Sequence, residues 1–215
     1  MAESDLAANT SSGAGVLMSV EFYENNADTF IAQTVDVDMA SLYQQFCKHL
    51  KPSASVLDAG CGSGRDTLAF SRMGYDVVAF DASVKMVAAA SKRTCLPVYK
   101  MTFQDMGFDR RFDGIWACAS LLHVPRTQLA EVLRSLAEFL EPTGVLYASF
   151  KYGKQEREKG GRYFNDMDEA HLEHLVSLVP NLQVLESWTT ADKRPDRASE
   201  KWLNVIFAGR PEGDL

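Results

Sequence analysis

The chain has 215 residues, a formal net charge of −7 at pH 7, 46% hydrophobic residues and 24% charged residues. A domain of this length can bury a full core, and this composition excludes a disordered chain, a collagen-like chain and a disulfide-dense secreted module. The acidic balance argues against tight, sequence-independent binding of duplex nucleic acid, which needs a cationic surface.

The cysteines and the apolar runs bear on the compartment. The four cysteines form no Cys-x-x-Cys pair, so the sequence indicates neither a zinc site nor a redox motif, and we expect no metal. No apolar run approaches the roughly 18 residues of a membrane-spanning helix, and the first residues lack the pattern of a signal peptide. We therefore expect a cytoplasmic protein without membrane contact, as a monomer or homodimer.

The N-terminal part of the chain divides into two segments. Residues 1–18 begin with small and polar residues, and we expect a flexible tail there. Residues 19–215 are expected to form a single domain, with a helical N-terminal cover over 19–52 and a core over 53–210. The cover is predicted because apolar side chains from Met39 to Leu50 recur with helical spacing.

Short apolar runs alternate with amphipathic segments through the core. Strands are predicted at residues 55–58, 76–80, 96–100, 112–117, 145–150, 182–189 and 202–208, and helices at 67–73, 84–92, 129–140 and 172–179. The last helix is expected to start with a capping box formed by Asp166 and Glu169, and residues 151–163 are predicted to be a loop. This alternation favours an α/β fold that is Rossmann-like and doubly wound. We expect a mostly parallel seven-stranded sheet with an antiparallel last strand.

A glycine-rich loop follows the first predicted strand. Gly60, Gly62 and Gly64 let the backbone turn tightly and approach a ligand, and the following helix offers free N–H groups. Asp81 ends the next strand, where a carboxylate can accept hydrogen bonds from ribose hydroxyls. These features predict a nucleoside-containing cofactor. A dinucleotide fingerprint needs glycine where Arg65 stands, which disfavours the alternative of an NAD-dependent oxidoreductase.

The run Val-Leu-Asp-Ala-Gly-Cys-Gly-Ser-Gly-Arg at residues 56–65 resembles the signature loop of class I S-adenosylmethionine-dependent methyltransferases. The resemblance extends from about residue 20 to 210 and includes residues 77–81, 104–106, 112–116 and 141–146. It departs from the family at Thr143, where a glycine is common. The glycine loop with its Arg-Asp ending also looks like that of tellurite-resistance-type and thiopurine-type small-molecule methyltransferases.

The resemblance implies S-adenosylmethionine as cofactor, S-adenosylhomocysteine as its product, and a role for individual residues. The cofactor's amino-acid portion would be held by Gly60, Cys61, Gly62 and Arg65, with Asp58 orienting the loop from behind and with Ala119 and Ser120 beneath the methionine arm. The nucleoside would be held by Asp81 at the ribose and by Ala82, Met86, Asp105 and Met106 at the adenine.

Methyl transfer is an in-line displacement, for which the protein aligns the acceptor and, for some acceptors, removes a proton. His123 follows the fourth predicted strand and is the candidate general base, because histidine titrates near neutrality. Tyr23, on the predicted cover, is a second candidate for contact with the reacting groups. The alternative interpretation of both residues is packing without contact to the acceptor.

Two basic segments follow the fifth predicted strand and precede the last one. Arginine suits the recognition of carboxylate or phosphate, so we hypothesise a small, anionic acceptor. The candidate acceptor-binding residues are Tyr152, Arg157, Arg162, Tyr163, Arg194 and Arg197. For each of them the alternative is a solvated loop position. For the whole chain the alternatives are a methyltransferase acting on tRNA or another nucleic acid, and a noncatalytic S-adenosylmethionine-binding protein.

Overall fold

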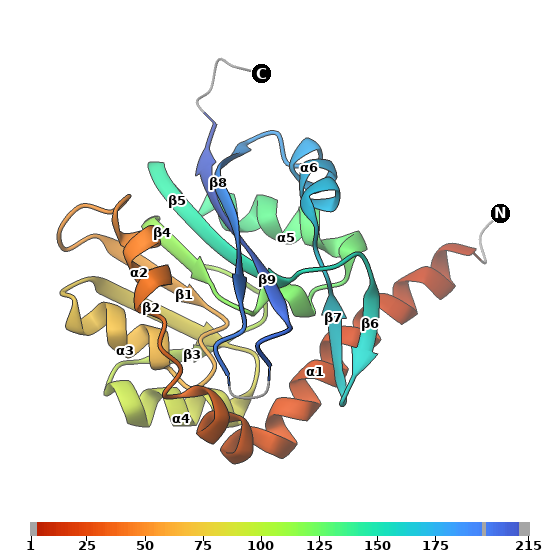
Figure 1. Cartoon of the computed structure of the whole chain (residues 1–215), viewed down its shortest axis with the longest axis horizontal. Coiled ribbons are helices and arrows are strands. Elements are labelled where there is room, and N and C mark those ends of the chain that lie inside the picture. Colours follow the sequence, from red (N-terminus) through yellow and green to blue (C-terminus); the bar gives the residue numbers. More distant parts are fainter. Residues whose placement is uncertain (1–3, 195–196, 211–215) are drawn as a thin grey trace.

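A computed structural model describes residues 4–194 and 197–210, with side chains described from residue 15 (Figure 1). A seven-stranded sheet forms its centre, in the order β3-β2-β1-β4-β5-β9-β8. The strands are β1 (Ser55–Ala59), β2 (Asp76–Asp81), β3 (Val98–Lys100), β4 (Phe112–Ala117), β5 (Leu140–Lys151), β8 (Leu182–Ala191) and β9 (Lys201–Gly209). β9 pairs antiparallel with β5 and β8, and the other neighbours pair parallel. The predicted sheet is confirmed.

Helices cover both faces of the sheet, because its central strands are apolar on both sides. The helices after the first are α2 (Ala40–Cys47), α3 (Arg65–Arg72), α4 (Val84–Thr94), α5 (Arg126–Glu138) and α6 (Glu169–Ser177). α2 and α3 pack Phe46 and Phe70 against Trp116 of β4. On the other face, side chains of α5 and α6 pack with Leu57 and Ile115. Among the described residues, no helix has the length and apolar character needed to cross a membrane.

The first helix, α1 (Ser4–Thr34), differs from the prediction for the N-terminus. A flexible tail was expected through residue 18, but the chain is helical from Ser4, and residues 1–3 lie outside the described residues. Alanine has the highest helix propensity and the segment contains no proline, which favours a helix over a loose tail. α1 bends at Asn26, whose φ and ψ are −125° and 19° and whose side chain donates to the Phe22 carbonyl.

A β-hairpin stands where a loop was predicted over residues 151–163. β6 (Glu156–Lys159) pairs antiparallel with β7 (Arg162–Asn165). Gly160 and Gly161 connect them with φ of 59° and 73°, the positive values that a tight two-residue turn requires. The loop prediction was wrong because it weighed the charge of this segment and not its glycine pair. The hairpin lies beside α1, with β7 in contact with that helix (Figure 1).

Two element boundaries also differ from the predictions. Asp168, not Asp166, caps α6, because its side chain accepts a hydrogen bond from the His171 N–H at 2.9 Å. Asp166 is instead paired with an arginine of the hairpin. α5 ends at Glu138 and β5 begins at Leu140, so the strand is longer than predicted and takes in the turn residues that were expected to end the helix.

Candidate active site

A cavity of about 410 Å³ lies at the carboxyl ends of β1, β2 and β4. Strand order reverses between β1 and β4, and ligands of open α/β sheets bind at such a point. Residues of α1, the hairpin and the β8–β9 connection line the cavity opposite the sheet. Of the residues proposed from the sequence, those that line it are Tyr23, Gly60, Cys61, Gly62, Arg65, Asp81, Ala82, Met86, Ala119, Ser120, His123, Arg157, Arg162, Arg194 and Arg197.

The glycine loop is shaped by close packing on one side and open space on the other. A Cβ added at Gly60, whose φ is 79°, would lie 2.5 Å from the Ser120 Cβ, so this position admits only glycine. At Gly62, whose φ is 53°, an added Cβ would meet no atom within 4 Å. The loop therefore presents a backbone without side chains toward the cavity at Gly62, where a ligand can approach closely.

Asp81 is held at the end of β2 by two backbone N–H groups. Its Oδ2 accepts from Gly62 at 2.8 Å and its Oδ1 accepts from Ser83 at 2.9 Å. Burial raises the pKa of this carboxyl, and the hydrogen bonds from the backbone oppose that shift. Each oxygen keeps a free lone pair, so the carboxyl can accept further hydrogen bonds from a ligand's hydroxyls.

Arg65 and Asp66 form a fixed pair in the cavity wall. Arg65 donates to both carboxylate oxygens of Asp66, at 2.6 and 2.9 Å, and also to the Thr34 carbonyl of α1. Tyr43 and Trp116 donate to the same carboxylate at 2.5 and 2.9 Å. Burial alone would raise the pKa of Asp66, but the Arg65 charge and these hydrogen bonds hold it below its usual value. Asp66 was given no role in the sequence analysis, because its partners are distant along the chain.

Ala119 and Ser120 follow β4 and support the floor of the cavity. The Ala119 N–H donates to the Ser149 hydroxyl at 2.9 Å, and the Ser120 hydroxyl donates to the Ala59 carbonyl at 2.7 Å. These bonds tie the ends of β1, β4 and β5 together.

Several proposed residues lie outside the cavity. Asp58 is buried behind the loop and accepts from the Thr67 hydroxyl at 2.5 Å. Asp105 is exposed and accepts from Thr102, so the wall expected from this segment is built by residues 101–104 instead. Those absent from the lining are Asp58, Asp105, Met106, Tyr152 and Tyr163, and their predicted roles toward cofactor and acceptor remain predictions.

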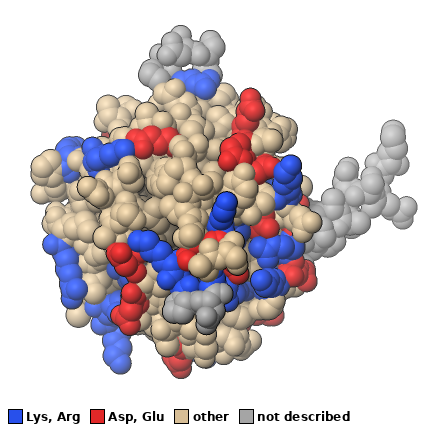
Figure 2. Space-filling model, viewed as in Figure 1, with Lys and Arg blue, Asp and Glu red and all other residues tan. Residues whose placement is uncertain are grey.

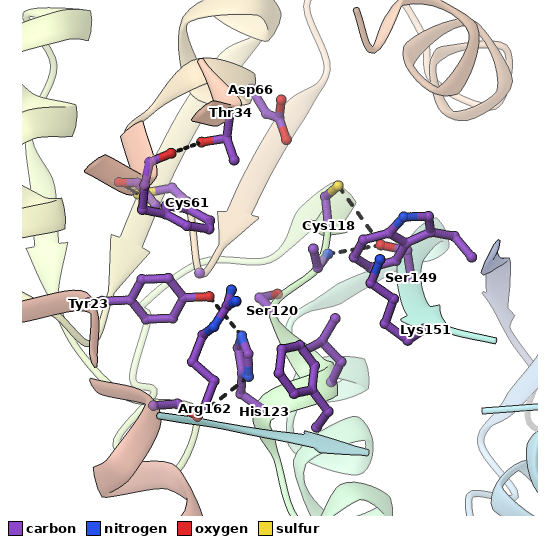
Figure 3. A pocket seen from close by; sticks show the side chains of 18 of the residues that line it. Tyr23, Thr34, Cys61, Asp66, Cys118, Ser120, His123, Ser149, Lys151 and Arg162 are labelled. Carbon is purple, nitrogen blue, oxygen red and sulfur yellow. Dashed lines mark hydrogen bonds between the residues drawn. The ribbon is translucent and has the colours of Figure 1, made fainter. Parts of the chain in front are cut away.

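Tyr23 and His123 are joined by a hydrogen bond of 2.9 Å between the Tyr23 Oη and the His123 Nε2 (Figure 3). The His123 Nδ1 lies 2.6 Å from the Tyr163 carbonyl oxygen. A carbonyl only accepts, so Nδ1 carries the ring proton and Nε2 accepts from the tyrosine hydroxyl. Burial lowers the pKa of His123 to about 4. The imidazole is therefore neutral at pH 7, with its basic nitrogen bonded to Tyr23.

The candidate arginines differ in their partners. Arg157 pairs with both oxygens of Asp166, at 2.7 and 2.9 Å, and Arg194 pairs in the same way with Asp192. Arg197 lies 3.7 Å from Glu200. Of the two tyrosines, Tyr152 is exposed and donates to Glu169, and Tyr163 bonds to Glu156. Arg162 lies among aromatic rings beside Tyr23 and His123 (Figure 3).

Comparisons with known proteins agree with this architecture. Residues 56–144 match the family described as a methyltransferase domain. A protein described as an uncharacterized methyltransferase of Staphylococcus carnosus is 26% identical over 76% of this chain and 77% of that protein. A ubiquinone biosynthesis O-methyltransferase of Xanthomonas campestris is 31% identical over 46% of this chain and 43% of that protein. The chain spans half or less of the length of several other curated relatives that it matches.

A solved structure is similar over nearly the whole chain. It is the Burkholderia thailandensis 1,6-didemethyltoxoflavin-N1-methyltransferase, with bound 1,6-didemethyltoxoflavin and S-adenosylhomocysteine. Its TM-score is 0.74 at 24% identity, and the match covers 92% of this chain and 89% of that one. At this identity the likeness shows a common fold.

The sheet order, the glycine loop with its acid, and the matched domain define the class of this protein. It belongs to the class I S-adenosylmethionine-dependent methyltransferases, and S-adenosylmethionine is the cofactor of that class. The resemblance to the tellurite-resistance-type group remains a prediction from the glycine loop.

Proposed function

We propose that this enzyme transfers the methyl group of S-adenosylmethionine to a small acceptor that lies between the glycine loop and Tyr23. The observation that carries this proposal is the hydrogen-bonded pair of Tyr23 and His123, which lines the same cavity as Gly62 and Asp81. A cofactor-binding loop and a proton-accepting pair in one cavity are what methyl transfer to a protonated acceptor requires.

The residues around the loop fit the cofactor in shape and chemistry. The open face at Gly62 leaves room for a close approach, and the free lone pairs of Asp81 suit ribose hydroxyls. Ala82, Met86 and Phe103 offer apolar surface for a purine. When bound, S-adenosylmethionine supplies an electrophilic methyl group on a positively charged sulfur.

The Tyr23–His123 pair can take a proton from the acceptor. An acceptor O–H or N–H that donates to the Tyr23 oxygen can pass its proton there while Tyr23 passes its own proton to the His123 Nε2. The hydrogen bond from Nδ1 to the Tyr163 carbonyl then stabilises the imidazolium. A raised pKa, caused mainly by burial, keeps Tyr23 protonated until an acceptor engages it.

The enclosure of the cavity favours a small acceptor over a nucleic acid. α1 and the hairpin both line the cavity, so a polymer has no open groove along the Tyr23–His123 pair. On the face shown in Figure 2, basic and acidic side chains lie interspersed, and the chain as a whole carries a charge of −7. A nucleic-acid enzyme needs a broad cationic surface instead.

Isothermal calorimetry with S-adenosylmethionine and with NAD tests the cofactor part of the proposal. We expect the wild-type protein to bind S-adenosylmethionine and not NAD, and we expect Asp81→Ala to weaken that binding at least tenfold. Gln104→Ala, at an exposed position of the cavity rim, is the matched control and should change the affinity by less than about threefold. An absence of S-adenosylmethionine binding by the folded wild-type protein would contradict the proposal.

A further inference from the structure

We propose that Arg162 binds a carboxylate of the methyl acceptor, so that the substrates of this enzyme are small carboxylic acids. The inference rests on the proposed function, because it names the substrate class of the same site. It assigns to a single side chain the anion recognition that the sequence distributed over four arginines.

Arg162 stands apart from the other basic residues of the cavity wall because it forms no ion pair within the described part of the chain. Each of the others has a carboxylate within 4.0 Å: Arg65 has Asp66, Lys151 has Asp192 and Glu200, Arg157 has Asp166, Lys159 and Arg197 have Glu200, Lys193 has Asp38, and Arg194 has Asp192. Their charges are already compensated within the protein. The charge of Arg162 is left for a ligand.

The guanidinium of Arg162 also has an unsatisfied donor. Its Nε is buried and has no hydrogen-bond partner in the structure. A buried N–H without a partner costs about 1–3 kcal/mol, which a ligand that accepts from it recovers. The Nε and a terminal nitrogen form an edge that matches the two oxygens of a carboxylate.

Aromatic rings hold this guanidinium in place. Its Cζ lies 4.5 Å from the ring centre of Phe22, 5.9 Å from that of Phe30 and 5.2 Å from that of Phe164. These rings come from α1 and β7, the two elements that meet at this edge of the cavity. Rings satisfy the faces of a guanidinium without using its N–H groups, and their low polarity strengthens its attraction for an anion.

The position of Arg162 also suits the chemistry of the site. It lies next to Tyr23 and His123, so a carboxylate bound there places the rest of the acceptor beside the Tyr23 hydroxyl (Figure 3). Two titratable or charged groups face His123, which are Tyr23 from α1 and Arg162 from β7, and the Arg162 charge contributes to the lowered pKa of the imidazole. A bound carboxylate compensates that charge and makes His123 a stronger base when an acceptor is present.

Benzoate is a suitable probe, with benzamide as its neutral counterpart and inorganic phosphate as a different anion. Titration by calorimetry and by NMR of the His123 ring uses the full-length protein saturated with S-adenosylhomocysteine. We expect benzoate to bind at least tenfold more tightly than benzamide or phosphate and to raise the His123 pKa. Arg162→Gln should weaken benzoate binding at least tenfold and leave the affinity for S-adenosylhomocysteine within about twofold.

Arg134→Gln removes one positive charge outside the cavity and is the matched control. It should leave benzoate binding within about twofold. Equal binding of benzoate and benzamide, or a benzoate affinity that Arg162→Gln does not change, would overturn the inference while the proposed function stands. Tighter binding of phosphate than of benzoate would overturn the assignment to carboxylic acids. Loss of S-adenosylhomocysteine binding by the wild-type protein would instead contradict the proposed function.

Discussion

Tyr23 and His123 are the two residues on which the proposed chemistry depends. The geometry gives each a distinct task, because Tyr23 faces the cavity and His123 Nε2 stands behind its hydroxyl. His123→Asn keeps a donor for the Tyr163 carbonyl and removes the nitrogen that accepts from Tyr23. It therefore separates proton transfer from packing.

Tyr23→Phe and His123→Asn should each lower kcat by about 10²–10³-fold, the range by which a positioned acid–base group contributes. The affinity for S-adenosylmethionine should stay within about twofold, because neither residue belongs to the glycine loop. Steady-state kinetics with calorimetry checks both values. Tyr99→Phe, at an exposed position of β3, is the control and should have no effect. Unchanged kcat in both variants would leave the pair with a packing role alone.

His123 should also make stability depend on pH. Its pKa is about 4 in the folded protein and near 6.5 when unfolded, so below pH 6.5 the unfolded chain binds a proton that the folded chain does not. The free energy of unfolding should therefore fall as the pH drops from 6.5 to 4, by at most about 3 kcal/mol from this group. Urea denaturation at several pH values measures it. His123→Asn should give a flatter profile, and parallel profiles for the two proteins would contradict the burial of a neutral imidazole.

The residues of the cofactor loop could be predicted from the sequence to a greater degree than those facing the acceptor. Gly60, Gly62 and Asp81 lie near one another because the motif itself fixes a strand, a turn and a second parallel strand. The pairing of Arg157 with Asp166, which removes that arginine from the free cations, depends on how the hairpin packs. Spacing along the chain carries no information about such a contact.

The β6–β7 hairpin is the element that sets this site apart from the sheet that supports it. It brings Arg162 and the Tyr163 carbonyl to the cavity, and its position beside α1 closes the site around Tyr23 (Figure 1). The turn depends on two consecutive residues with positive φ, at Gly160 and Gly161.

Gly160→Ala tests the turn without adding a steric contact, since an added Cβ would meet no atom within 4 Å. A left-handed backbone costs a non-glycine residue about 1–2 kcal/mol, and we expect a loss of stability of this size in thermal or urea unfolding. Gly107→Ala is the matched control, because its added Cβ also meets no atom within 4 Å and its φ is not positive. Equal stability of the two variants would contradict the turn geometry.

Among the elements, the sequence predicted the seven strands of the sheet well, because each is a buried apolar run between turn residues. It missed the hairpin and the helical N-terminus. The hairpin strands are short and charged and have one buried side, so they lack the apolar signal of a core strand. The Gly160–Gly161 pair between them was the signal available, since two glycines in sequence favour a two-residue turn.

At the scale of the whole molecule, a common sheet holds the cofactor loop, and a separate layer of α1 and the hairpin covers it. The sheet order and the antiparallel last strand follow from the alternation of elements, and both were predicted. The size and walls of the cavity were not, because they depend on how α1 and the hairpin pack across the strand ends.

Because the cofactor site joins β1, β2 and the cover, binding should stabilise the entire fold. At a concentration one hundred times the Kd, S-adenosylmethionine should add about 2.7 kcal/mol to the free energy of unfolding. For a chain of this length that corresponds to a rise in Tm of roughly 5–10 °C. Differential scanning fluorimetry measures it, and NAD at the same concentration should give no rise. Equal shifts with both compounds would contradict the assignment of the cofactor.

The most direct test of the account is methyl transfer itself. The wild-type protein, with S-adenosylmethionine labelled in its methyl group, is incubated with acidic and neutral fractions of small metabolites, and the label in each product is counted. We predict label in the acidic fraction, a rate at least about 10²-fold lower for His123→Asn, and S-adenosylmethionine affinity retained in that variant. A wild-type protein that binds S-adenosylmethionine and labels no small molecule, or a His123→Asn variant that labels as fast as the wild type, would contradict the account.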